Sequence, residues 1–236
     1  MLAMDLLWFL QRRLTFVSNL YDESTAVFQE RIRKIDAGAP PFVDNRSAEH
    51  EDVSEPLFLE QYQQAGESIE VIGHWCLCMV YASCKAYLEE YIREMERDYR
   101  GLGDLRTKLA GKKAKSWFER YRLLFLEELG IDWRKGPVDL AQLEHLNLTR
   151  DDVTHNVDVM SILVFQTDRH KEQHPKGLFI DDWACLSLGG RIKVGREELT
   201  AALRTVDGFC AWLEDIRLHY PSYIKSLAES QSSEVS

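Results

Sequence analysis

The residues with the clearest chemical potential lie in the sequence Arg-Asp-Asp-Val-Thr-His at positions 150–155. Arg150 can hold phosphoryl oxygens through two parallel N–H bonds, because its planar guanidinium matches the geometry of a phosphate. His155 can give or take a proton near neutral pH, because the pKa of a free imidazole is about 6.5. Asp151 stands four residues before His155, on the same face of a helix, where a carboxylate can orient the imidazole. These residue types suit the cleavage of a phosphodiester.

The spacing of this pair does not by itself make a catalytic site. With 18 arginines and seven histidines, a chain of this length contains one R-x4-H pair by chance about every second time. The plain alternative is a capped helix start with an exposed Arg150 and a half-buried His155. Geometry adds a constraint, because five residues turn an ideal helix by about 500°, so the two side chains point about 140° apart. A single helix therefore presents them poorly to one substrate, unless Arg150 lies in the first helical turn and bends back.

The spacing of apolar residues predicts long helices before this motif. The first is predicted over residues 2–36. The polar, proline-containing segment 38–56 is predicted to be a long loop. The second helix is predicted over about 57–97, a rod near 60 Å long at about 1.5 Å per residue. Gly66 and Gly73 are the positions at which this rod could bend.

Shorter helices are predicted around the motif itself. One covers about 114–129, and the next covers about 138–147. Thr149 and Asp152 have the Ser/Thr-x-x-acid spacing of a capping box. We therefore expect a helix to begin or restart after Thr149 and to cover about 150–165.

The rest of the chain completes an all-α helical bundle with long antiparallel helices and one small β-hairpin. The stretch 166–177 is predicted to be a polar loop. Residues 184–194 alternate around a Gly-Gly pair, which predicts a small β-hairpin. The last helix is predicted over 196–218. We expect one domain over 1–227 and a flexible, frayed tail over 228–236.

Net charge argues against indiscriminate binding to nucleic acid. The chain has 39 acidic and 29 basic side chains, a net charge of −10, whose wider field repels phosphate. Between residues 97 and 122, however, nine basic residues face three acidic ones, with Tyr99, Trp117 and Tyr121 interleaved for base stacking. The candidate nucleic-acid contacts in this segment are Arg106, Lys108, Lys112, Lys113, Lys115 and Arg120. The alternative is a solvated basic face on a helical connection.

Two histidine-containing segments resemble metal sites only in part. His74, Cys76 and Cys78 would lie on one helix, where residues at i, i+2 and i+4 do not converge, so we interpret them as core residues. His170 and His174 have the i, i+4 spacing of a helical metal pair but lack a third ligand nearby, so we interpret them as parts of a solvated loop. No phosphate-binding glycine loop is present either. We expect no metal and no cofactor.

The N-terminus and the cysteines bear on the compartment. Residues 1–10 are apolar but lack a basic start and contain Asp5, which argues against a signal peptide. No segment reaches the roughly 18 uncharged apolar residues of a membrane span. Five cysteines, mostly within helical patterns, are typical of reduced thiols. We expect a cytoplasmic protein without a membrane contact.

In helix order and in the position of the motif, residues 57–218 resemble the HEPN superfamily of α-helical bundles, which carry R-x4-6-H, commonly with a polar residue just after the arginine. The matching residues are Arg150, Asp151 and His155. The resemblance implies a metal-independent RNA endonuclease without a cofactor, in which Arg150 and His155 are catalytic and Asp151 supports them. It also implies a homodimer that joins two motifs in one cleft, a toxin or defence setting, and an antitoxin or other regulatory partner protein.

Two departures from the HEPN pattern matter. Asp151 replaces the asparagine frequently found there, and Val157 stands where one subgroup has a tyrosine that an antitoxin modifies. Control through that tyrosine is therefore not expected. Two alternatives remain: a HEPN-like bundle without catalysis that serves as an interaction or nucleotide-binding module, and a structural protein that assembles through its 57–97 helix.

Overall fold

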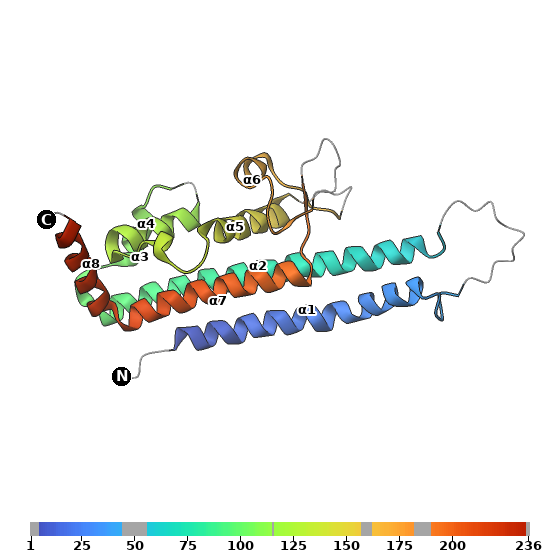
Figure 1. Ribbon diagram of the computed structural model, residues 1–236, viewed down its shortest axis with the longest axis horizontal. Coiled ribbons are helices and arrows are strands. Elements are labelled where there is room, and N and C mark those ends of the chain that lie inside the picture. Colours follow the sequence, from blue (N-terminus) through green and yellow to red (C-terminus); the bar gives the residue numbers. More distant parts are fainter. Residues whose placement is uncertain (1–4, 44–55, 115, 157–161, 182–189, 235–236) are drawn as a thin grey trace, which may run out of the picture. The chain divides into compact units, whose positions relative to one another are not determined.

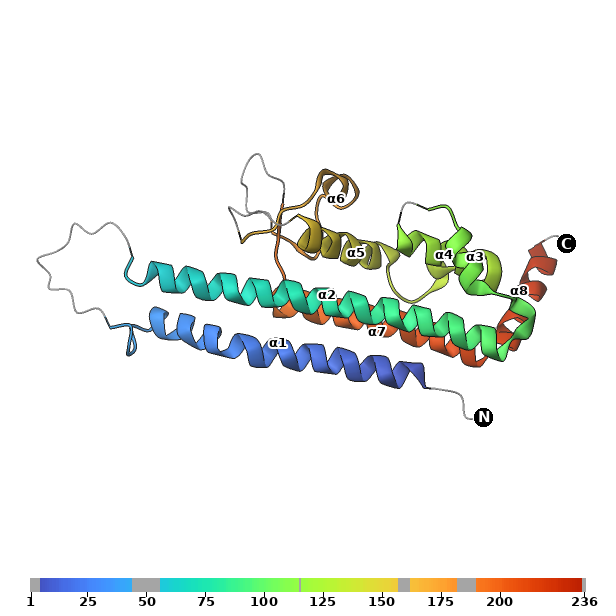
Figure 2. The same ribbon diagram turned by 180° about the vertical axis from the view of Figure 1, so that it is seen from behind.

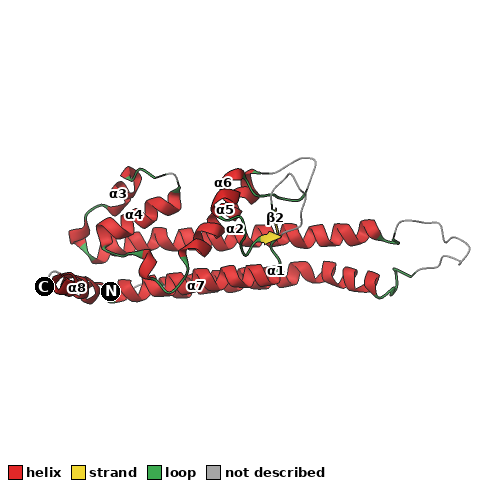
Figure 3. Cartoon of the chain, turned by 45° about the horizontal axis from the view of Figure 1, so that its top comes forward, coloured by secondary structure: helices red, strands yellow, loops and turns green. Residues whose placement is uncertain are grey.

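The computed structural model describes residues 5–43, 56–114, 116–156, 162–181 and 190–234, and it is dominated by helices (Figures 1, 2 and 3). It is 76% helical, and within these ranges it contains eight α-helices and one two-stranded antiparallel hairpin. The predicted all-α class with one small hairpin is confirmed.

Helix α1 spans Leu6–Asp36 and matches the first predicted helix. Its buried side chains recur every three or four residues, as one face of a helix requires. They are Leu6, Leu10, Leu14, Val17, Tyr21 and Thr25. The carboxylate of Asp5 accepts a hydrogen bond from the backbone N–H of Trp8 at 2.9 Å and caps the start. Gly38, with a left-handed φ of 56°, follows the end.

Helix α2 spans Leu59–Asp98 without interruption, so Gly66 and Gly73, at which it could have bent, both lie within continuous helix. Its 40 residues extend over about 60 Å. A Cβ atom on Gly73 would lie 1.9 Å from the carbonyl oxygen of Val194, whereas one on Gly66 would meet nothing within 4 Å. Gly73 therefore allows the backbone at Val194 to approach the helix closely.

The apolar character of α2 bears on membrane contact. By length and hydropathy, α2 is the one described helix that could cross a bilayer, and 56% of its most apolar window is buried within the protein. A core helix passes the same test, so this result alone carries little weight. Consistent with a packed position, Arg31 of α1 donates a hydrogen bond to Gln64 of α2 at 3.3 Å, where the two helices run antiparallel (Figures 1 and 2).

Helices α3, Leu105–Gly111, and α4, Trp117–Leu129, lie side by side (Figures 1 and 2). The sequence interpretation missed α3 and started α4 three residues early. Asp104 caps α3 by accepting from the N–H of Thr107, and Ser116 caps α4 by accepting from the N–H of Glu119. The predicted end at about residue 129 is confirmed, since Gly130 adopts a left-handed conformation directly after Leu129.

Helix α5, Leu140–His155, replaces the two helices predicted over 138–147 and 150–165. Thr149 is fully buried in the middle of α5 and starts no helix. The expected capping box is absent because the Asp152 carboxylate instead accepts hydrogen bonds from residues 15 and 18 positions further along the chain. The helix ends at His155, and the described residues 162–165 are not helical.

The region predicted as a polar loop contains helix α6, Asp168–Gln173. Strands β1, Ile180–Asp181, and β2, Arg191–Ile192, then form the hairpin. Strand β2 lies within the predicted hairpin segment 184–194, whereas β1, with which it pairs, lies before that segment. The predicted first strand and Gly189 lie outside the described residues.

Helix α7 spans Arg196–Leu218, as predicted. Helix α8, Tyr220–Glu234, follows after a single residue. Most of the segment 228–236, which was predicted to be frayed, therefore has a helical backbone.

The chain forms two compact units, and the predicted single domain over 1–227 stays a prediction. Unit 1 consists of Met1–Thr15, Val80–Asn147 and Ala201–Ser236, and unit 2 consists of Phe16–Met79 and Leu148–Thr200. Helices α1, α2, α5 and α7 each contribute residues to both units.

The two glycines of α2 provide a matched test of the close approach at Val194. Gly73→Ala should lower the free energy of unfolding by about 1–3 kcal/mol, because the added methyl group overlaps a backbone oxygen. Gly66→Ala should raise it by about 0.5–1 kcal/mol, because alanine is the better helix former and has room there. Urea unfolding of both variants measures the difference. Equal effects of the two substitutions would contradict the packing described here.

Candidate functional site

The motif occupies the last two turns of α5, not the start of a helix. Arg150 and Asp151 form an ion pair there, with Arg150 Nη1 2.9 Å from Asp151 Oδ1. Their side chains are 32% and 38% exposed, so both reach solvent. The backbone of this turn is regular, and the Thr154 hydroxyl donates to the Arg150 carbonyl at 2.9 Å.

His155 is the last residue of α5 and is exposed. Because α5 is continuous from Leu140, Arg150 has no first helical turn from which to bend back. The ideal-helix angle of about 140° between Arg150 and His155 therefore applies. Arg150 and Asp151 contact each other, but one copy of α5 does not direct Arg150 and His155 to the same point.

Cys78 of α2 lies beside the Arg150–Asp151 pair. Burial raises the pKa of the Cys78 thiol, while the charge of Arg150 lowers it and the charge of Asp151 raises it further. The sequence interpretation of this cysteine as a core thiol is incomplete, since its side chain is partly exposed. Cys78 belongs to the surroundings of the motif, and nothing in its helical spacing indicated this.

Asp152 forms a buried polar cluster with Thr167 and His170, which the sequence interpretation missed. Its Oδ2 lies 2.6 Å from His170 Nδ1, and its Oδ1 accepts from the Thr167 hydroxyl at 2.8 Å. The side chains of Asp152 and His170 are 3% and 0% exposed, so the predicted solvated loop around His170 is wrong. A threonine followed by an acid, as in Thr167-Asp168, is a helix-start signal that could have revealed α6.

His74 and Cys76 of α2 behave as core residues, as predicted. The ring nitrogen Nε2 of His74 lies 3.2 Å from the Ile192 carbonyl, and burial lowers the pKa of this imidazole. Burial also raises the pKa of the Cys76 thiol to about 11. Among the described residues, no group of three or more His, Cys, Asp or Glu side chains could hold a metal ion.

Three of the six predicted basic contacts form ion pairs within unit 1. Arg106 pairs with Glu96 at 3.0 Å, Lys108 pairs with Glu128 at 2.8 Å, and Lys112 contacts both Glu127 and Glu128. The ion pairs of Lys108 and Lys112 with these two glutamates connect α3 and the residue after it to α4. Much of the predicted positive charge is therefore neutralised locally, which net charge along the sequence could not show.

Two predicted contacts remain exposed. Lys113 and Arg120 face solvent, and the described part of the chain provides no ion pair for either of them. Lys115 lies outside the described residues. The exposed positive charge of this segment is thus smaller than its composition indicated.

The aromatic residues predicted to stack on bases pack against protein instead. Tyr121 is 5% exposed, and its ring lies 5.2 Å from that of Trp117. Trp117 also packs edge-on against Tyr81. The ring of Tyr99 packs against that of Tyr220 in a tilted arrangement, and its hydroxyl donates a hydrogen bond to the Arg217 carbonyl at 3.2 Å. Tyr121 is therefore too buried to stack on a base, whereas Tyr99 and Trp117 pack within unit 1 but stay partly exposed.

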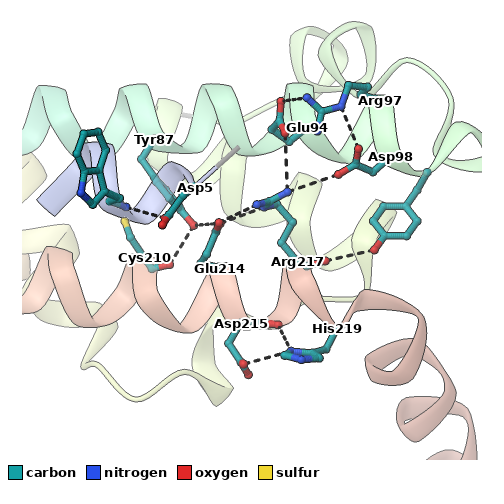
Figure 4. A network of polar contacts seen from close by, with 12 residues as sticks. Asp5, Tyr87, Glu94, Arg97, Asp98, Cys210, Glu214, Asp215, Arg217 and His219 are labelled. Carbon is teal, nitrogen blue, oxygen red and sulfur yellow. Dashed lines mark hydrogen bonds and ion pairs between the residues drawn. The ribbon is translucent and has the colours of Figure 1, made fainter. Parts of the chain in front are cut away.

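A second buried polar cluster lies in unit 1 between α2 and α7 (Figure 4). Arg217, 2% exposed, donates to Glu214 at 2.7 Å and lies 3.9 Å from Glu94 and 3.5 Å from Asp98. Tyr87 donates its hydroxyl to Glu214 at 3.0 Å. The carboxylates here are paired with guanidinium groups, so this cluster is a structural ion network.

Removal of the Arg217 guanidinium should therefore destabilise the protein. Arg217→Met should lower the free energy of unfolding by about 3–5 kcal/mol, because Glu214 would stay buried without its cation. The matched control, Arg33→Met, breaks a solvent-exposed pair with Glu30 and should leave the free energy of unfolding almost unchanged. Urea unfolding compares them. A neutral effect of Arg217→Met would contradict the account.

Comparisons with protein-family models, with curated proteins and with solved structures gave no match to this chain. Its function must therefore be argued from its own residues.

Proposed function

We propose that this protein is a metal-independent RNA endonuclease of the HEPN type, acting as a homodimer in a toxin or defence setting under a regulatory partner protein. The observation that carries the proposal is the motif on α5. Arg150 and Asp151 are paired at the surface, and an exposed His155 ends the same helix.

The chemistry follows from these residue types. One His155 takes the proton from the ribose 2′-OH, whose oxygen attacks the adjacent phosphorus. The P–O5′ bond breaks, and the partner subunit's His155 protonates the leaving oxygen. Arg150 stabilises the charge that builds up on the phosphoryl oxygens. The products carry a 2′,3′-cyclic phosphate and a 5′-hydroxyl.

A dimer resolves the geometric difficulty of one helix. Because Arg150 and His155 diverge by about 140° on α5, the Arg150 of one copy serves the His155 of the other across a shared groove. The ion pair with Asp151 engages Nη1 of Arg150. Since a guanidinium has five N–H donors, this pair is compatible with a simultaneous contact to phosphate. Asp151 thereby orients the arginine.

Electrostatics confine binding to local positions. The net charge of −10 opposes general attraction of RNA, and three of the predicted basic contacts are paired with glutamates. We assign the RNA contacts outside the motif to the exposed Lys113 and Arg120. Binding of this kind, with few free cations, depends weakly on salt.

One observation favours the alternative, a non-catalytic interaction or nucleotide-binding module. The Asp151 carboxylate occupies part of the Arg150 guanidinium, and an acid beside the phosphate weakens its binding. The two functions predict different effects of removing the His155 imidazole, because only catalysis by His155 makes RNA cleavage depend on it.

Substitution of His155 by alanine tests the proposal. His155→Ala should reduce RNA cleavage in EDTA by about 10²–10⁴-fold, the usual contribution of general acid–base catalysis. The fold should stay intact because the side chain is exposed. Cleavage rates on a labelled RNA, together with circular dichroism of both proteins, measure the two effects.

The matched control is His219→Ala. His219 is also exposed, with its side chain 68% accessible, and its ring lies 3.3 Å from Asp215 in unit 1. This variant should cleave at the rate of the unmodified protein. Undiminished cleavage by His155→Ala, or equal losses in both variants, would exclude the assignment.

A further inference from the structure

We propose that His170 and Asp152 are positioning residues for the α5 site: the bond between them fixes the last turn of α5, which carries His155. The proposal rests on the function proposed above, in which His155 transfers protons. Its experiment includes one measurement that does not depend on RNA cleavage.

The first step is the strength of the cluster. The Asp152 carboxylate accepts from His170 Nδ1 at 2.6 Å, from the Thr167 hydroxyl at 2.8 Å and from the Thr167 N–H at 3.3 Å. Asp152 and His170 are almost completely buried. The loss of hydrogen bonds to a buried carboxylate is costly, because its oxygens are left without donors and without solvent.

The second step leads from Asp152 to His155. The two residues lie three positions apart on the last turn of α5. The Asp152 carbonyl accepts from the Asn156 N–H at 2.9 Å, and the Asn156 side chain donates to the Phe165 carbonyl at 2.9 Å. The final turns of helices usually fray. Here both the side chain and the backbone of Asp152 hold that turn in place.

The third step is the frame on the other side of the cluster. Thr167 caps α6 and His170 lies within it, beside the end of α5 (Figures 1 and 2). The Gln166 N–H donates to the Gly190 carbonyl at 3.0 Å, next to β2. Arg191 of β2 is fixed to the buried Glu70 of α2 through its Nε at 3.1 Å. The cluster therefore connects the His155 turn to a braced part of unit 2.

His170 and His155 therefore have different roles in the proposed reaction. His170 is completely buried and does not reach a substrate, so it acts only through the position of His155. A displacement of about 1 Å in a reacting group can reduce a rate by about 10²-fold. Loss of the cluster should thus slow the chemical step more than it weakens RNA binding.

Two substitutions at one position provide the test. His170→Leu removes the donor to Asp152, whereas His170→Asn keeps an N–H near the place of Nδ1. We expect His170→Leu to lower kcat by about 10²-fold with little change in KM. His170→Asn should restore most of the rate. Hydrogen exchange at the Asn156 amide should become faster in His170→Leu and stay slow in His170→Asn.

Thr25→Val is the matched control, since it removes another buried hydroxyl donor of unit 2, which donates to the Tyr21 carbonyl of α1 at 2.8 Å. It should leave exchange at Asn156 and kcat unchanged. If His170→Leu does not fold, Thr167→Val removes a second donor to Asp152 from an exposed position and should act in the same direction.

The outcomes separate the two proposals. Unchanged exchange at Asn156 in the folded His170→Leu or Thr167→Val variant, or an equal loss of kcat in Thr25→Val, overturns the positioning role. If the unmodified protein does not cleave RNA, the proposed function fails. Faster exchange at Asn156 in His170→Leu alone then still supports the positioning role.

Discussion

A buried carboxylate must be given hydrogen-bond donors, and at Asp152 this requirement determines how the end of α5 is built. Its donors come from Thr167 and His170, so α6 must form and dock where those side chains can reach it. The same residue holds the Asn156 amide through its carbonyl. The candidate catalytic turn, its neighbouring helix and the segment leading to β2 thus depend on one acidic side chain.

Much of the helical framework follows from local periodicity. Helices α2 and α7 were predicted to within two residues at each end, and α1 ends where predicted, because their buried positions recur at helical spacing over 23 or more residues. Gly73 shows where this reasoning stops. A glycine inside a helix indicates a bend or a close approach, and only the position of Val194 distinguishes them.

The interpretation of the site was less successful, for physical reasons. Thr149 and Asp152 have capping-box spacing, yet burial of Thr149 and the distant partners of Asp152 prevail over the local signal. His170 looked solvated because its neighbours along the chain are charged, although its ring faces the interior. Tertiary partners decide such cases, and a single sequence does not reveal them.

Tertiary contacts also determine how much positive charge the basic segment 97–122 exposes. Lys108 and Lys112 belong to a positive stretch of sequence, but in space they meet Glu127 and Glu128, which lie on the following helix. The proposed RNA-binding surface therefore contains fewer unpaired cations than the sequence predicts. The paired Arg150 and the exposed His155 remain the residues best suited to phosphodiester chemistry.

The chemistry of the RNA ends tests the central claim most directly. The purified protein should cleave RNA in the presence of EDTA and leave a 2′,3′-cyclic phosphate on one fragment and a 5′-hydroxyl on the other. RNA with 2′-deoxy sugars at the cleaved nucleotides should resist it, because the attacking oxygen is missing. Intact RNA, or fragments with 5′-phosphate and 3′-hydroxyl ends, would contradict the account.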